Sequence, residues 1–189
     1  MRAAAQRPPR LRFVLPPTWE GFGLHDPQAC ERKVERIARS LPLDDGKGAA
    51  LRRQVREDLR GQVASARQAG ATYLAISGPR SAPLSGSIVL TPVPSSLALD
   101  DEAWEDQLPD DAETFRLSAG RVTRVVGTRT ADVSGLATLV VDYWVLGPDR
   151  RQVHLACSTP LVAHRDAMVA LFDAVVDSAE WHVASEEQQ

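Results

Sequence analysis

A chain of 189 residues is long enough to form one domain with a complete hydrophobic core, and 43% hydrophobic and 25% charged residues are ordinary for a globular protein. Lys and Arg together number 22 against 25 Asp and Glu, so the formal net charge is −3. This balance argues against a dedicated nucleic-acid binder, because such proteins usually carry a clear excess of basic residues.

The N-terminal segment predicts neither export nor membrane anchoring. Residues 1–10 are expected to form a disordered arm, and a short strand over residues 11–15 stops at two prolines. An early Arg is present, but Pro8 and Pro9 interrupt the apolar run that a signal peptide needs, and no lipobox Cys follows. The longest apolar runs elsewhere are too short to span a bilayer. We therefore expect a cytoplasmic protein that does not bind a membrane.

Two amphipathic helices are predicted next. Asp26 and Pro27 form an N-cap and first-turn pair for a helix that ends before Pro42. Its apolar residues recur at helical spacing and share one face: Cys30, Val34, Ile37 and Leu41. A second helix is predicted over residues 48–69, with an apolar stripe of Leu51, Val55, Leu59, Val63 and Ala66. The Arg-rich opposite face of this helix is interpreted as solvated.

The hydrophobic period then changes from helical to alternating. Residues 72–77 and 86–93 alternate as strands do, and a loop rich in Gly, Pro and Ser joins them. Residues 100–113 contain eight acidic residues and no basic one, which is too polar for a core. This acidic segment is expected to be an exposed excursion around Trp104.

A four-stranded antiparallel meander is predicted for the second half of the chain. Alternating segments are separated by short turns, which favours hairpin connections between neighbouring strands. The expected strands cover residues 114–118, 121–130, 136–146 and 151–158. On the third of these strands, one face is entirely core-like and the other face is mixed.

The last predicted element is a helix over residues 160–180, with Thr159 as its N-cap and Pro160 as its first residue. The residues at core spacing are Met168, Leu171, Phe172, Val175 and Ala179, while Asp166, Asp173, Asp177 and Glu180 take the solvent side. The sequence therefore predicts one α+β domain over residues 11–183, an antiparallel sheet of about six to seven strands sandwiched by helices. Residues 184–189 are expected to be a disordered tail.

This order of elements resembles the PsbP-like (Mog/PsbP) superfamily, in particular its branches of LpqN-type actinobacterial lipoproteins and Eag-type secretion chaperones. The matching features are Trp19 after a proline, "DYWV" at residues 142–145, "CSTP" at residues 157–160, and a terminal amphipathic helix closed by Trp181. The chain departs from the lipoproteins because it shows no lipidation signal, and the acidic segment 100–113 has no counterpart. The resemblance implies a non-enzymatic role in binding another protein, although a fold does not determine a function.

Three residues suggest catalytic chemistry but have simpler interpretations. By strand parity, Asp142 and His154 share the mixed face of the sheet, where a carboxylate–imidazole pair is more often a cross-strand contact than a dyad. Ser158 lacks a nucleophile-elbow motif and belongs to a helix-start sequence. We expect these residues to be structural and the protein not to be an enzyme.

Metal and cofactor sites are not predicted. The four His residues lack any metal-ligand spacing, and no phosphate-binding glycine motif occurs. Cys30 and Cys157 fall on apolar faces and are interpreted as small buried residues in a reduced compartment.

The leading hypothesis is a cytoplasmic adaptor or chaperone-like accessory protein that binds another protein, with a link to a specialised secretion system implied by the resemblance. The candidate partner-binding residues are Trp104, Asp101, Glu102, Asp106, Trp144 and His154. Two alternatives stay open. One is a small-ligand binder or enzyme that uses the sheet face around Asp142, Trp144 and His154, and the other is an electrostatic decoy that uses the acidic segment.

Overall fold

The computed structural model describes residues 10–41, 48–78, 85–94, 109–130 and 135–182. The described strands are β1 (Arg10–Arg12), β2 (Trp19–Gly23), β3 (Tyr73–Ser77), β4 (Ser87–Val93), β5 (Glu113–Leu117), β6 (Gly120–Thr130), β7 (Ala137–Leu146), β8 (Gln152–Thr159) and β9 (Glu180–His182). The described helices are α1 (Pro27–Arg39), α2 (Gly48–Gln68) and α4 (Arg165–Asp177), with 3-10 turns η1 (Pro148–Arg150) and η2 (Val162–His164).

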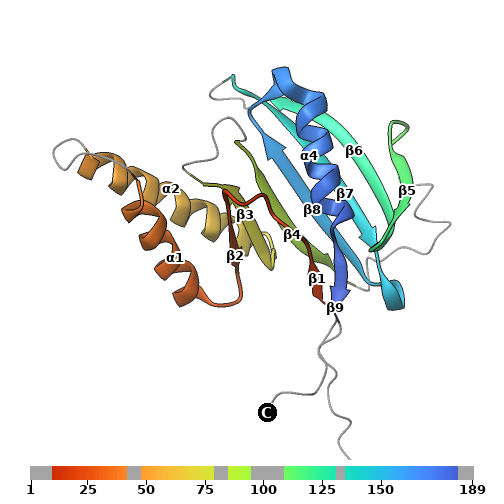
Figure 1. The fold of residues 1–189 in the computed structure, drawn as a ribbon, viewed down its shortest axis with the longest axis horizontal. Helices are drawn as coiled ribbons and strands as arrows, with labels where there is room; N and C mark the ends of the chain where they lie inside the picture. Colours follow the sequence, from red (N-terminus) through yellow and green to blue (C-terminus); the bar gives the residue numbers. More distant parts are fainter. Residues whose placement is uncertain (1–9, 42–47, 79–84, 95–108, 131–134, 183–189) are drawn as a thin grey trace, which may run out of the picture.

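The main sheet is antiparallel and has seven strands in the order β2-β3-β4-β8-β7-β6-β5. β1 and β9 pair separately as a small two-stranded sheet. Figure 1 shows α4 across one face of the main sheet and the α1–α2 hairpin at the end formed by β2 and β3. The predicted α+β class and the antiparallel meander of β5, β6, β7 and β8 are confirmed.

The larger of two hydrophobic clusters lies between α4 and the sheet. Phe172 of α4 is fully buried, and its ring meets Trp19 of β2 edge-on at 6.4 Å between ring centroids. The opposing strand residues alternate along β7 and β8 and are fully buried: Leu139, Val141, Tyr143, Leu155 and Cys157. The predicted core-facing alternation of β7 therefore specifies where α4 packs.

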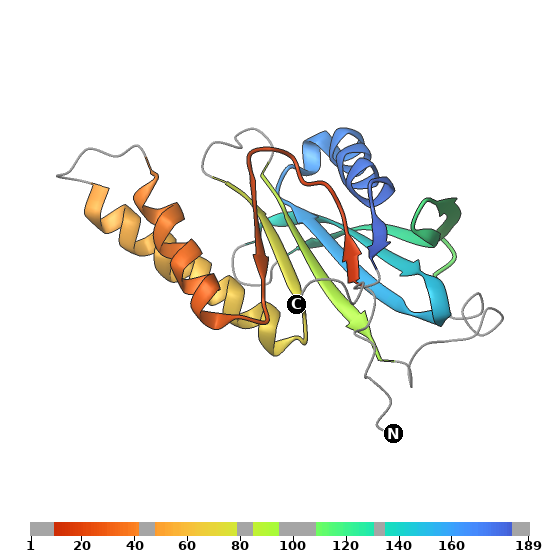
Figure 2. The same ribbon diagram turned by 60° about the horizontal axis from the view of Figure 1, so that its bottom comes forward.

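The second cluster joins the α1–α2 hairpin to the other side of β2 and β3. Phe22, Leu74 and Ile76 of these strands meet the buried stripes of the two helices. Asp26 caps α1 as predicted, because its carboxylate accepts hydrogen bonds from the backbone N–H groups of Gln28 and Ala29 at 2.9 and 3.0 Å. The two clusters show that helices cover both faces of the sheet, although at different places. Figure 2 shows the hairpin standing away from α4 at the far end of the sheet.

The predicted limits of the last helix are wrong at both ends. β8 continues to Thr159, whose hydroxyl donates to the Ser85 carbonyl at 2.5 Å and accepts from the Leu161 N–H at 3.1 Å. This local turn delays the α-helix, so that the 3-10 turn η2 comes first and α4 begins at Arg165. After α4, the segment containing Trp181 forms β9 instead of a last helical turn.

Three further expectations need correction. β2, which begins at Trp19, is a strand where none was predicted between residue 15 and the helix capped by Asp26. The N-terminal strand is β1, which is shorter than predicted and belongs to the small sheet. Leu51, expected in the buried stripe of α2, is 49% exposed because only the C-terminal part of α2 lies over β3.

We predict that Phe172→Ala lowers the free energy of unfolding by about 3–5 kcal/mol, because truncation of a fully buried aromatic ring leaves a cavity beneath α4. Chemical denaturation measures this change. Leu51→Ala is the matched control on an exposed helical site and should cost at most about 0.5 kcal/mol. Equal effects of the two substitutions would contradict the packing of α4.

Candidate functional site

One side of the sheet is not covered by α4 over its long strands. We call this surface the open face, and it comprises Val125, Val140, Asp142, Trp144, His154 and Ala156. These residues alternate with the core residues of β6, β7 and β8 and are partly exposed, whereas Thr123 and Gln152 on the same side are buried. Neither hydrophobic cluster includes a described residue from this side of the three strands.

The open face and the α1–α2 hairpin are on the same side of the sheet. Strand register aligns Leu74, Val89, Ala156 and Asp142 in one row across β3, β4, β8 and β7. Leu74 and Val89 contact the hairpin cluster, whereas the row continues onto the open face at Ala156. The hairpin therefore borders the open face at one end.

Three side chains at the centre of the open face interact with one another. His154 lies directly opposite Trp144 in the register, and the two rings are stacked with centroids 4.9 Å apart and planes 22° apart. His154 Nε2 is 2.8 Å from Asp142 Oδ1. The Arg129 guanidinium reaches Asp142 Oδ2 at 3.6 Å. Asp142 is thereby shared between an imidazole and an arginine, and the side chains of Asp142 and His154 are 15% and 30% exposed.

Ser158 does not complete a catalytic triad with Asp142 and His154. It lies on the same side of β8 as His154, but four residues along a strand correspond to about 13 Å. Its hydroxyl instead pairs with the Ser87 hydroxyl across β4 and β8 at 2.8 Å. The arrangement thus provides a carboxylate–imidazole pair with no contact to this serine.

The acidic part of the predicted binding site falls outside the described residues. Trp104, Asp101, Glu102 and Asp106 all belong to residues 95–108, so their assignment stays a prediction. Of the predicted partner-binding residues, the structure brings together Trp144 and His154.

A network of hydrogen bonds and ion pairs beneath α4 was not predicted from the sequence. Tyr143 is fully buried, and its hydroxyl donates to Asp173 Oδ1 at 2.7 Å. Arg124 pairs with the same Asp173 and with Glu113. Burial, together with the hydrogen bond to Asp173, raises the pKa of Tyr143 far above its ordinary value. Asp173 was predicted to face solvent, and its side chain is 34% exposed, but its bonds to Tyr143 and Arg124 were not predicted. The signal was a Tyr on a core face, since a buried hydroxyl needs an acceptor.

The described residues offer no metal cluster and no activated thiol. Within these residues, no three His, Cys, Asp or Glu side chains gather closely enough to hold a metal ion. Cys30 and Cys157 are both buried and unpaired by disulfides, and burial raises the pKa of each thiol. A raised thiol pKa disfavours the nucleophilic thiolate, so both cysteines act as core residues. No described helix is long and apolar enough to cross a membrane.

Comparisons with known proteins give only weak similarities. No family model and no curated protein matches the chain. Among solved structures it is similar to LpqN of Mycobacterium tuberculosis, described as involved in cell envelope biogenesis, with a TM-score of 0.46 and 10% identity over 95% of this chain and 87% of that one. A protein of Bacteroides thetaiotaomicron VPI-5482 gives a TM-score of 0.46 and 11% identity over 95% of this chain and 47% of the other. These are weak likenesses at the level of the fold.

We predict that the Trp144–His154 stack is a cross-strand contact of ordinary strength. A double-mutant cycle with Trp144→Ala and His154→Ala should give a coupling free energy of about 0.2–1 kcal/mol, the range for neighbouring pairs on a sheet. A control cycle that replaces His154→Ala with Ser87→Ala should be additive, because Ser87 does not oppose Trp144. Equal coupling in both cycles would argue against a specific stack.

Proposed function

We propose that this protein is a non-enzymatic protein-binding module, an adaptor or chaperone-like accessory protein, and that its partner docks on the open face. The observation that supports the proposal is the Trp144–His154 stack at the centre of a sheet surface that α4 leaves uncovered. A tryptophan supplies a large contact area at little cost in conformational entropy, which is why it is enriched among residues that dominate binding.

The composition of the open face suits a protein partner. Val125 and Ala156 lie directly opposite Asp142, and Val140 precedes it on β7, so apolar side chains adjoin the stack on the Asp142 side, while Asp142 and Arg129 add polar groups. Protein interfaces combine aromatic and apolar contact area with polar groups. The hydrogen bond from His154 to Asp142 also limits the motion of the imidazole, so less entropy is lost on binding.

A small ligand is favoured less because the two hollows found on the described surface lie away from the open face. One follows α1 and is lined by Glu31, Arg32 and Arg36 among others, and the other lies beside α4 near Arg124 and Asp173. Small-molecule sites are concave and bury most of their ligand. The open face, in contrast, is one surface of three adjacent long strands and contains neither of these hollows.

The alternative function is a small-ligand binder or enzyme that uses Asp142, Trp144 and His154. The observation in its favour is the 2.8 Å contact between His154 Nε2 and Asp142 Oδ1, since a carboxylate can orient an imidazole for proton transfer. This alternative requires that replacement of His154 removes a chemical activity of the protein while the fold stays intact.

Several finer assignments rest on the sequence alone and remain proposals. They are the PsbP-like assignment, a link to a specialised secretion system, a cytoplasmic location, and an anchoring role for Trp104 within the acidic segment 100–113. None of them is needed for the open face to bind a partner.

We predict that Trp144→Ala abolishes retention of the partner in a pull-down from the native host, because loss of a central aromatic residue costs at least about 2 kcal/mol of binding free energy. Trp104→Ala tests the acidic segment in the same experiment. Arg165→Ala replaces an exposed residue of α4 on the opposite side of the sheet, and this control variant should still retain the partner. Melting temperatures of all variants verify folding.

The proposal fails if folded Trp144→Ala keeps every partner. Loss of a cellular activity in folded His154→Ala, with partners retained, would instead support the enzyme alternative. Loss of the partner in Trp104→Ala alone would move the docking surface to the acidic segment.

A further inference from the structure

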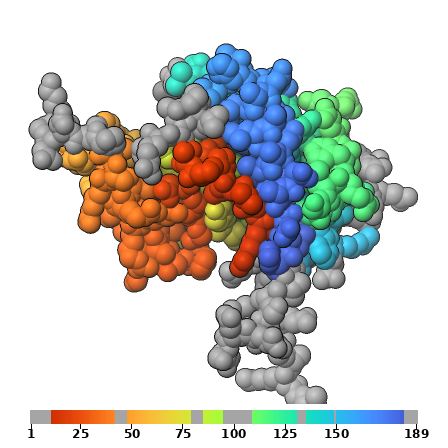
Figure 3. Space-filling view, viewed as in Figure 1, coloured from red at the N-terminus to blue at the C-terminus, as the bar shows by residue number. Residues whose placement is uncertain are grey.

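The α1–α2 hairpin carries a charge opposite to that of the whole chain. Its two helices contain nine Lys and Arg residues and four Asp and Glu residues, a net charge of +5, whereas the chain as a whole has −3. Figure 3 shows the hairpin (orange) as a lobe at one end of the molecule. A basic lobe on an acidic protein produces a local positive potential that the overall charge conceals.

The acidic residues of α1 are already engaged between the two helices. Arg60 of α2 donates to both carboxylate oxygens of Glu31, and Arg56 reaches Glu35 at 2.6 Å. The hydrogen bond from Arg60 lowers the pKa of Glu31, so this carboxylate is held in its charged form. The interhelical pairs therefore leave the positive charge of α1 largely uncompensated on its outer side.

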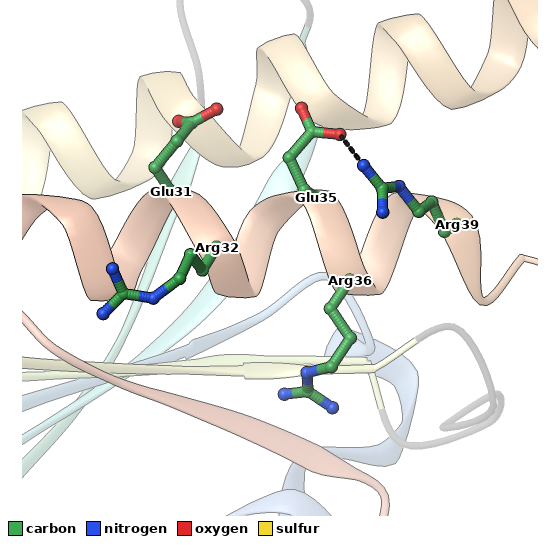
Figure 4. A pocket seen from close by; sticks show the side chains of 5 residues that line it. All are labelled: Glu31, Arg32, Glu35, Arg36 and Arg39. Atoms are coloured by element: carbon green, nitrogen blue, oxygen red, sulfur yellow. Dashed lines mark ion pairs between the residues drawn. The ribbon is translucent and has the colours of Figure 1, made fainter.

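Three arginines form a row on that outer side. Arg32, Arg36 and Arg39, which we call the arginine stripe, follow helical i, i+4, i+7 spacing and extend over about 10 Å. Their side chains are 69%, 61% and 79% exposed. Figure 4 shows Arg32 and Arg36 pointing away from α2, along the hollow that follows α1.

The contacts of the stripe within the chain are weak. Arg32 is 3.9 Å from Asp26, whose carboxylate already caps α1, and Arg39 is 3.9 Å from Glu35, which Arg56 binds more closely. Among the described residues, only Arg36 of the stripe has a closer partner, Glu20 at 3.1 Å. Exposed pairs of this kind contribute little, so guanidinium donors of the stripe stay available to an external acceptor.

We propose that the arginine stripe binds an acidic polypeptide segment of a partner protein. Guanidinium groups bind carboxylates through two parallel hydrogen bonds, and a row of arginines one helical turn apart suits separate carboxylates along a peptide. A nucleic acid fits less well, because three arginines over about 10 Å neutralise few phosphates, and the affinity for a nucleic-acid backbone depends on the number of phosphates contacted. This surface involves the hairpin alone and does not depend on the open face.

The experiment uses the full chain and a fluorescein-labelled 14-residue peptide of alternating Glu and Ser, titrated by fluorescence anisotropy at low salt. Arg32→Glu combined with Arg39→Glu should weaken binding by about tenfold or more, because favourable charges become repulsive. Arg151→Glu combined with Arg165→Glu makes the same change in net charge away from the hairpin and should alter the affinity less than about twofold. Arg32→Gln combined with Arg39→Gln gives an intermediate loss without charge reversal.

Several results would overturn the proposal. These are no binding of the peptide to the wild type, equal weakening by the control pair, or tighter binding of a 14-base-pair DNA duplex that depends on the same arginines. Circular dichroism and melting temperatures verify folding, and the Gln variant supplies the test if the Glu variant unfolds. Trp144→Ala should bind the peptide unchanged, which distinguishes failure of the stripe from failure of the open face.

Discussion

The packing of α4 against one side of β7 and β8 is the constraint on which the rest of the structure depends. A helix with its side chains is about 10–12 Å wide, whereas seven strands about 4.8 Å apart form a much wider sheet, so one helix cannot cover a whole face. Phe172 fixes the position of α4 through full burial and its contact with Trp19. Asp173 of the same helix accepts a hydrogen bond from Tyr143 and forms an ion pair with Arg124, and these contacts also hold α4 in its orientation on the sheet.

The second helical layer is displaced along the sheet and lies on its other side. The α1–α2 hairpin covers β2 and β3, and its cluster extends no farther than Val89 of β4 among the described strand residues. Beyond Val89, successive side chains of each strand point to opposite sides of the sheet. One set is buried beneath α4, and the other set, which includes Trp144 and His154, lies on the open face. Because the hairpin and the open face share a side, a partner on the open face would have the basic hairpin as its neighbour.

The sequence was sufficient for those parts of the fold in which local pattern and tertiary packing agree. Alternation along β7 predicted both the meander and the shared face of Asp142 and His154. β2 was missed because two glycines interrupt its pattern, and one of them, Gly21, packs closely against the Tyr73 hydroxyl, so that an added Cβ would force the Tyr73 side chain to shift. The arginine stripe was missed because the sequence analysis considered the net charge of the whole chain and one charged face of α2. The exposed positive charge of α1 depends instead on the ion pairs by which arginines of α2 bind the glutamates of α1. Such pairing across two helices has no signal in the spacing of a single helix.

The most direct measurement is methyl NMR of the labelled protein during titration with the partner recovered by co-purification. Val125, Val140 and Ala156 report on the open face, while Val141 and Leu155 of the same strands face α4. Our account predicts that the first three methyl signals shift strongly and that the last two change little. Shifts confined to the residues beneath α4, with the open-face methyl groups unchanged, would contradict the assignment of the open face as the docking surface.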